Sequence, residues 1–168
     1  MRILLFALAF LLSACSTASF AGEGTSHHAG HDEPRPFMAD RDAHADVDAA
    51  LARARKHGTL ALIVMGGNWC HDSRGLAAAF ARSETADLIA RDYELVWVNV
   101  GYKVLNQDIA HDFGLDGTPG TPTVIVARAD GTVLNLDDAP TWRNAASRKP
   151  ADIHAFFADM AARHRGNG

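Results

Sequence analysis

Residues 66–75, GGNWCHDSRG, place a tryptophan and a cysteine between an apolar run and a helical pattern. The apolar run before them, TLALIVM at 59–65, is continuous and contains β-branched residues, which is typical of a strand covered on both faces. After them, from Cys70 to Arg82, apolar residues recur at the spacing of one helix face. The sequence therefore predicts that Cys70 lies between a buried strand and the first turn of a helix.

The segments on both sides of this junction alternate between helical and strand-like patterns. Helical spacing of apolar residues also occurs at 42–58, 84–92, 106–114 and 150–164. A second apolar run at 94–100 predicts another strand, and 121–136 predicts a β-hairpin that turns at Ala129–Asp130–Gly131. These elements predict an α/β fold over residues 37–165, with a central mixed sheet flanked by helices. The polar loop that holds Trp142 and Arg143 has no predicted role.

The first residues have the pattern of an export signal. A charged start precedes an apolar stretch at 3–12, which is too short to remain in a membrane as a spanning helix. The sequence LSAC at 12–15 resembles the lipobox of bacterial lipoproteins, which implies that residues 1–15 are the signal and that Cys15 is lipidated. Because Ser16 follows, the same resemblance implies a periplasmic protein tethered to the outer membrane through this lipid.

An ordinary cleavable signal is the alternative at the N-terminus. Small residues in Ser19–Phe20–Ala21 permit cleavage after Ala21, which would remove Cys15 altogether. Both alternatives export the protein, and in both the mature chain keeps Cys70 as its single free thiol. A lone thiol in an oxidising compartment is open to mixed-disulfide formation, so its presence calls for a chemical reason.

Residues 16–36 are small, polar and rich in glycine and histidine. Such a segment buries too little apolar surface to offset its ordering entropy, so we expect a flexible tether. Imidazole and carboxylate groups in it are suitable ligands for a weakly held divalent metal; they belong to His27, His28, His31, Asp32 and Glu33. Their spacing defines no coordination geometry, and no metal site is predicted.

The composition excludes some classes of partner. The formal net charge is −4, and the basic residues are scattered along the chain instead of forming a stripe. The sequence therefore predicts no basic surface that could neutralise phosphates, and we expect no nucleic-acid partner. No cofactor is predicted either.

Three motifs in this chain, in this order, resemble those of thioredoxin-fold proteins. They are Trp69–Ser73 after a buried strand, Gly120–Thr123 before another strand, and the Asp130–Gly131 turn. The resemblance implies a thioredoxin-like fold with a cis-proline loop before a C-terminal β-hairpin and helix. It also implies that the peptide bond before Pro122 is cis and that this proline lies against Cys70.

The chemistry of such a site depends on the thiolate of Cys70. A cysteine at a helix N-terminus faces free backbone N–H groups and the positive end of the helix dipole, both of which lower its pKa. Ser73, one turn later, can donate a hydrogen bond to the thiolate, and Trp69 can shield one side of it. The backbone of Thr121, before Pro122, is expected to pair with an extended substrate segment.

Ser73 stands where a two-cysteine site would have its second thiol. A hydroxyl is too basic and too weakly nucleophilic to attack a mixed disulfide, so an outside thiol must resolve any mixed disulfide on Cys70. This favours disulfide isomerisation, glutathione-dependent exchange or reduction of a sulfenic acid over a self-sufficient reductase.

The buried acidic residue of thioredoxins, six positions before the first cysteine, corresponds here to Val64. His71 and Asp72 are the candidates to replace it as proton acceptor. A protonated His71 would lower the pKa of Cys70, and an ionised Asp72 would raise it. The sequence does not decide between these opposing effects.

The leading hypothesis is extracytoplasmic thiol-disulfide exchange by Cys70 on protein or small-molecule thiols. A non-catalytic binding module is the main alternative, in which Cys70, His71 and the tether handle a soft metal such as copper. Cys70 can also be a buried cysteine without chemistry. A thiol peroxidase is disfavoured, because no arginine and threonine are placed around Cys70 in the sequence as that reaction needs.

Overall fold

A three-stranded mixed sheet forms the centre of the computed structural model, which describes residues 33–166. Strand β1 (Leu60–Gly66) lies between β2 (Tyr93–Asn99), which is parallel to it, and β3 (Thr123–Ala127), which is antiparallel. Every residue of β1 is buried, as its continuous apolar run predicts. The predicted α/β class and central mixed sheet are confirmed.

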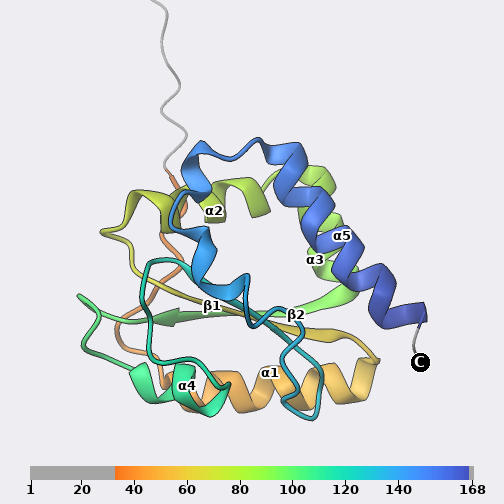
Figure 1. Ribbon diagram of the computed structural model, residues 1–168, viewed down its shortest axis with the longest axis horizontal. Coiled ribbons are helices and arrows are strands. Elements are labelled where there is room, and N and C mark those ends of the chain that lie inside the picture. The colour runs from red at the N-terminus through yellow and green to blue at the C-terminus, as the bar shows by residue number, and fades with distance from the viewer. Residues whose placement is uncertain (1–32, 167–168) are drawn as a thin grey trace, which may run out of the picture. The chain divides into compact units, whose positions relative to one another are not determined.

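Helices cover both faces of this sheet (Figure 1). One layer consists of α1 (Ala43–His57) and α4 (Gln107–Asp112), and the other of α2 (His71–Phe80), α3 (Ser83–Asp92) and α5 (Pro150–Gly166). Because successive strand residues point to opposite faces, Ile63 and Met65 pack with the first layer and Leu62 and Val64 with the second. The chain therefore has a separate apolar core on each side of the sheet.

Helix α1 begins and ends on local signals that the sequence carries. Asp42 is its N-cap, and the carboxylate of Asp42 accepts a hydrogen bond of 3.0 Å from the amide of Ala45. Gly58 closes the helix with a φ of 68°, a left-handed conformation that favours glycine. The helix directs the chain straight into β1 at Leu60.

The prediction of a β-hairpin at 121–136 is wrong for its second strand, the one that was expected to pair with β3. Only one residue pair, Ala127 with Val133, bridges the two segments. Beyond it, the buried amide side chain of Asn135 takes the place of a strand: it accepts from the amide of Val126 and donates to the carbonyl of Val124, both at 2.8 Å. A side chain that satisfies the edge of β3 removes the need for a longer paired strand.

Trp142 is a core residue, although its loop had no predicted role. It ends a short 3₁₀ helix (Ala139–Trp142) and is fully buried. Its ring stacks on Phe157 of α5 with centroids 5.2 Å apart and meets Phe156 edge to face. The guanidinium of Arg148 lies 4.1 Å from the ring centroid on the outside. This indole joins the loop to the core beneath α5.

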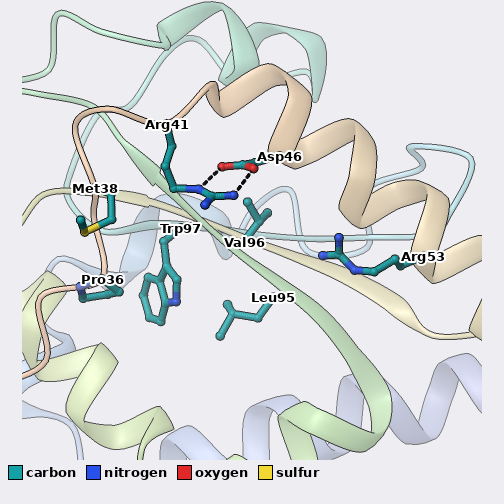
Figure 2. A pocket seen from close by; sticks show the side chains of 8 residues that line it. All are labelled: Pro36, Met38, Arg41, Asp46, Arg53, Leu95, Val96 and Trp97. Carbon is teal, nitrogen blue, oxygen red and sulfur yellow. Dashed lines mark hydrogen bonds and ion pairs between the residues drawn. The ribbon is translucent and has the colours of Figure 1, made fainter.

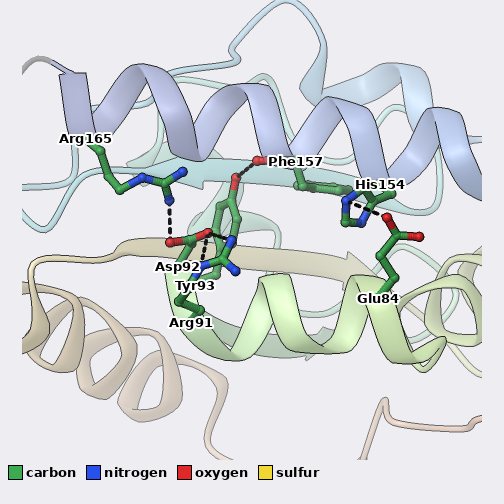
Figure 3. A network of polar contacts seen from close by, with 7 residues as sticks. All are labelled: Glu84, Arg91, Asp92, Tyr93, His154, Phe157 and Arg165. Carbon is green, nitrogen blue, oxygen red and sulfur yellow. Dashed lines mark hydrogen bonds and ion pairs between the residues drawn. The ribbon is translucent and has the colours of Figure 1, made fainter.

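Polar contacts hold α5 against α3 and the first residue of β2 (Figure 3). The carboxylate of Asp92 accepts hydrogen bonds from Arg91 and from Arg165 of α5. The hydroxyl of Tyr93 donates to the carbonyl of Phe157 at 2.6 Å. Burial alone would raise the pKa of Asp92, but the hydrogen bonds from the two arginines outweigh it and lower the pKa below its usual value.

A groove of about 330 Å³ lies beside β2, one of the two outer strands of the three-stranded sheet (Figure 2). It is lined by Pro36, Met38, Arg41, Asp46, Arg53, Leu95, Val96 and Trp97. The ion pair between Arg41 and Asp46 lies on the α1 side of the strand in the close-up. None of the predicted site residues lines this groove.

The predicted signal at 1–15, the lipidation site Cys15 and most of the predicted tether at 16–36 lie outside the described residues. The last residues of the tether are described, and the carboxylate of Glu33 accepts a hydrogen bond of 2.6 Å from Arg74 of α2. Across residues 33–166, no helix combines the length and apolar character needed to cross a membrane.

Candidate functional site

Cys70 is the N-cap residue of α2, directly after the turn that follows β1. Its backbone is extended, with φ −85° and ψ 124°, and its amide donates to the carbonyl of Gly67 at 3.0 Å. In the thiol form its side chain makes no capping hydrogen bond to the helix. The strand-to-helix junction predicted from the sequence therefore holds a partly exposed thiol.

Thr121 lies against this thiol although the two residues are 51 positions apart. The Thr121–Pro122 peptide bond is cis and immediately precedes β3. The Sγ–H of Cys70 donates to the carbonyl of Thr121 at 3.3 Å. The antiparallel pairing of β3 with β1 brings the start of one strand to the end of the other, where Cys70 follows.

The surroundings of Cys70 favour its thiolate. Burial of the sulfur alone would raise the pKa of Cys70. The side chains of Thr121 and Ser73, with the amides of Ser73 and Asp72 at the helix N-terminus, favour the thiolate; together they outweigh burial and lower the pKa of Cys70 below its ordinary value. More thiolate is therefore present at neutral pH than for an unperturbed cysteine.

Ser73 is fully buried beneath the junction. A Cβ at Gly66 would lie 2.5 Å from the Ser73 hydroxyl oxygen and 2.9 Å from the ring of Phe37, so glycine leaves the space that this side chain occupies. In the thiol form, the hydroxyl oxygen has no hydrogen-bond partner among the described residues. A buried hydroxyl without a partner is a donor available to a neighbouring anion, and the sulfur of Cys70 is that neighbour.

His71 and Asp72 have different surroundings. The carboxylate of Asp72 accepts a hydrogen bond of 2.9 Å from the amide of Ala146, which ties α2 to the 3₁₀ turn at Ala145–Ser147. His71 is exposed, lines a groove together with Glu33 and makes no hydrogen bond to Cys70 in the described structure. The geometry thus gives Asp72 a structural contact and shows no contact between His71 and the sulfur.

No carboxylate takes the place of the buried acidic residue of thioredoxins, whose position Val64 occupies here. Val64 is fully buried among apolar side chains of the α2 side. Within residues 33–166 the only buried carboxylate is that of Asp92, which precedes the first residue of β2. Because β1 and β2 are parallel, Asp92 lies at the end of the sheet opposite Cys70. Within residues 33–166, no buried carboxylate is therefore placed to accept the proton of the Cys70 thiol.

Asn68 is a site residue that sequence reasoning treated only as part of a turn. Its side-chain amide accepts from the amide of Phe37 at 3.2 Å and donates to the carbonyl of the same residue at 2.9 Å. Its own carbonyl accepts from Arg74 at 3.0 Å. These contacts fix the turn that carries Trp69 and Cys70. The sequence did not predict them, because Asn68 and Phe37 are 31 positions apart.

Trp69 forms the exposed rim of the site. Its ring stacks on Tyr102, with centroids 5.2 Å apart and an interplanar angle of 22°. Its indole N–H donates to the carbonyl of Gly101. The loop after β2 is thereby joined to the residue before Cys70. Tyr102 had no predicted role, because the sequence gives no sign of this contact.

The described residues contain no group of three or more His, Cys, Asp or Glu side chains placed to hold a metal ion. The histidines that the sequence offered as weak ligands, His27, His28 and His31, lie outside those residues. The metal-handling alternative therefore gains no support from the geometry around Cys70.

Comparisons with known proteins agree with this geometry. A family model described as thioredoxin-like matches residues 42–129. The crystal structure of a disulphide isomerase from Xylella fastidiosa Temecula1 is similar, with 30% sequence identity and a TM-score of 0.71, over 76% of this chain and 97% of that chain. Curated proteins gave no match. Because the family model spans about half of the chain and the mixed sheet between helix layers agrees with it, the chain belongs to the thioredoxin-like family.

Proposed function

We propose that this protein performs extracytoplasmic thiol-disulfide exchange with Cys70 as its single reactive thiol. The observation that carries this proposal is the buried, unpartnered hydroxyl of Ser73 beside a partly exposed sulfur at the first turn of α2. Such a hydroxyl can donate a hydrogen bond to a thiolate beside it and so stabilise it. The similarity to a disulphide isomerase supports the same class of reaction.

The exchange step needs only groups that the site holds. The thiolate of Cys70 attacks one sulfur of a substrate disulfide, a new S–S bond forms, and the old S–S bond breaks. The displaced sulfur leaves as a thiolate and takes a proton from water. One S–S bond replaces another, so no net oxidation occurs. Extended substrate backbone beside Thr121 would hold the disulfide in line with the attacking sulfur.

Resolution of the mixed disulfide requires a second thiol from outside the site. The hydroxyl of Ser73 cannot attack the mixed disulfide, because it is too weak a nucleophile at neutral pH. Cys15 and Cys70 are the only cysteines of the chain. We therefore propose that a substrate thiol, a second protein or a small thiol completes the reaction. Return of a substrate thiol gives isomerisation.

The pH dependence of Cys70 alkylation tests the proposal. The measurement uses a Cys15→Ser chain, so that Cys70 is the only thiol. Because hydrogen bonds lower its pKa, we expect the midpoint of the rate profile below about 8.5, the value of an unperturbed cysteine. At pH 7 the folded protein should therefore react faster with iodoacetamide than the same chain unfolded in urea, once the effect of urea on a model thiol is subtracted.

Ser73→Ala is the matched variant for this measurement. It removes the hydroxyl and leaves the helix N-terminus, so the midpoint should move upward, toward the unperturbed value. Cys70→Ser should abolish mixed disulfides trapped in the cell. A midpoint at or above 8.5, together with no trapped partner, would contradict the proposed exchange.

We also propose that the mature chain is anchored by a lipid on Cys15, which rests on the LSAC sequence at 12–15. Radiolabelled palmitate should enter the wild-type protein, and Cys15→Ser should remove the label. Cys70→Ser is the control and should keep it. A mature chain that begins at Gly22 by mass spectrometry, without label, would instead establish cleavage after Ala21 and a protein without an anchor.

A further inference from the structure

Basic side chains from four segments meet at the end of the sheet opposite Cys70. Strands β1 and β2 begin at this end, where Leu60 pairs with Tyr93, and β3 finishes there at Ala127. Helices α1, α3 and α5 end there too, and each has basic residues in its last turn (Figure 1). The members of this surface, here called the basic face, are Arg53, Arg55, Lys56, His57, Arg91, Arg128, Arg163, His164 and Arg165.

Contacts between the segments make the basic face one surface. Arg53 of α1 donates to the carboxylate of Glu94 in β2 at 2.7 Å, and the Nδ1 atom of His57 lies 2.7 Å from the same carboxylate. The guanidinium of Arg55 donates to the carbonyl of Ala129 at 3.0 Å, in the turn after β3. These bonds join the end of α1 to the start of one neighbouring strand and to the turn that follows the other.

Two adjoining grooves extend the basic face to α3 and α5. One, of about 210 Å³, is lined in part by His57, Arg91, His164 and Arg165. The other, of about 130 Å³, is lined in part by Arg128, Arg163 and the same His164. The dipole of each helix favours basic residues at its own C-terminus, but only the fold brings three helix ends and a turn together.

The basic face is positive, whereas the rest of the domain is negative. Seven of the fifteen Lys and Arg residues at 33–166 belong to it, and only four of the eighteen Asp and Glu residues lie among them: Asp92, Glu94, Asp130 and Asp159. Eight Lys and Arg residues and fourteen Asp and Glu residues remain for the rest of the domain. Such a separation of charge orients a protein beside a charged surface. The sequence did not predict this surface, because its members come from four separate segments.

The basic face lacks the apolar centre of a protein–protein interface. Six large hydrophobic side chains are exposed among residues 33–166, and none of them lines either groove. The core of a protein interface is depleted of charged residues and enriched in aromatic ones. A surface of arginine, lysine and histidine fits the phosphates of lipid headgroups instead, because attraction to an anionic membrane surface needs only charge.

The chain before the described residues is long enough for the basic face to reach a membrane that holds Cys15. Glu33 bonds to Arg74 in the first turn of α2, so the chain enters the domain at the Cys70 end. Cys15 lies eighteen positions before Glu33, and a stretch of that length spans at most about 60 Å when extended. Helix α5, which runs between the two ends of the domain, has 17 residues and is therefore about 25 Å long.

We propose that the basic face docks on a membrane surface rich in anionic lipid headgroups and so turns the thiol of Cys70 away from that membrane. Cys70 follows the end of β1, whereas the basic face lies where β1 begins. A domain held in this way presents its thiol to proteins outside the membrane. The contact is electrostatic and needs no reaction at Cys70, so it is independent of the proposed exchange function.

Co-sedimentation with lipid vesicles tests the docking. The protein is the mature chain of residues 15–168 with Cys15→Ser, so that no lipid is attached and every variant keeps the same N-terminal segment. At about 50 mM NaCl we expect binding to phosphatidylcholine vesicles that contain about 30% phosphatidylglycerol, and no binding to phosphatidylcholine alone. Raising NaCl to about 500 mM should abolish the binding, because salt screens the charges.

The double variant Lys56→Gln with Arg128→Gln removes two cations that make no ion pair within residues 33–166. Its partition coefficient on the anionic vesicles should fall about 25-fold, or about fivefold for each cation. Arg82→Gln with Lys149→Gln is the matched control. It removes two cations from just before α3 and α5, at the other end of those helices, and should bind as the wild type does.

An equal loss in the two double variants would show an effect of net charge alone and would overturn the docking face. Absence of binding to the anionic vesicles, or binding only to polyglutamate as an acidic polypeptide, would also overturn it. The proposed exchange by Cys70 would stand in each of these cases, because the vesicle measurement does not involve the thiol.

Discussion

Replacing Ser73 with cysteine is expected to give the site a second thiol that releases mixed disulfides from Cys70 within the same molecule. Position 73 lies one helical turn after Cys70, and Gly66 leaves the space that its side chain fills. A thiol there attacks within the molecule, so the mixed disulfide should decay on the order of a hundredfold faster than with millimolar outside thiol. Mass spectrometry of a pre-formed mixed disulfide with a peptide measures this decay.

The end state of the Ser73→Cys variant gives a second readout. After oxidation it should contain no free thiol in a Cys15→Ser background, because Cys70 and the new cysteine pair with each other. Ser73→Ala is the control: it also removes the hydroxyl but adds no nucleophile, so its mixed disulfides should persist as in the wild type. Persistence in the Ser73→Cys chain as well would show that position 73 cannot reach the Cys70 sulfur.

Trp142→Ala is expected to cost about 3–5 kcal/mol of unfolding free energy, as removal of a buried large aromatic side chain does. The indole is fully buried, stacks on Phe157 and meets Phe156 edge to face. Its loss would leave a cavity between the polar loop and α5. Urea unfolding followed by far-ultraviolet circular dichroism measures the loss as a lower midpoint with a similar slope.

Two further variants separate packing from other effects of Trp142. Trp142→Phe should recover most of the stability, because the indole N–H is buried without a hydrogen-bond partner in the described residues and phenylalanine omits it. Trp69→Ala, at an exposed tryptophan, should cost less than about 1 kcal/mol. A loss at Trp142 no larger than the loss at Trp69 would contradict the assignment of Trp142 to the core.

Local patterns in the sequence predict the helices and strands and the position of Cys70 among them. The continuous apolar run before Gly66 is buried on both faces in β1, and Gly58 ends α1 in the left-handed conformation. Cys70 lies at the strand-to-helix junction that these patterns predict. Each of these features depends on residues within a few positions of one another, so periodicity and capping chemistry are sufficient to identify them.

Contacts made by single side chains across long sequence separations were not predictable in the same way. Asn135 replaces most of a hairpin strand with one amide side chain, and a pattern of alternating residues contains no sign of this substitution. Trp142 occurs among polar residues, yet the aromatic side chains that bury it come from α5. Asn68 and Phe37 bond across 31 positions.

The sequence by itself determined the α/β class, the single cysteine of the site and the serine that stands where a second thiol would be, because residue identity and local spacing carry this information. Only the tertiary structure decided what surrounds the sulfur. The pairing of β1 with β3 brings Thr121 to Cys70, and the loop after β2 brings Tyr102 to Trp69. Packing of distant segments sets the electrostatic and apolar surroundings of a site. Those surroundings set the pKa values of its ionisable groups and the kinds of ligand it can bind.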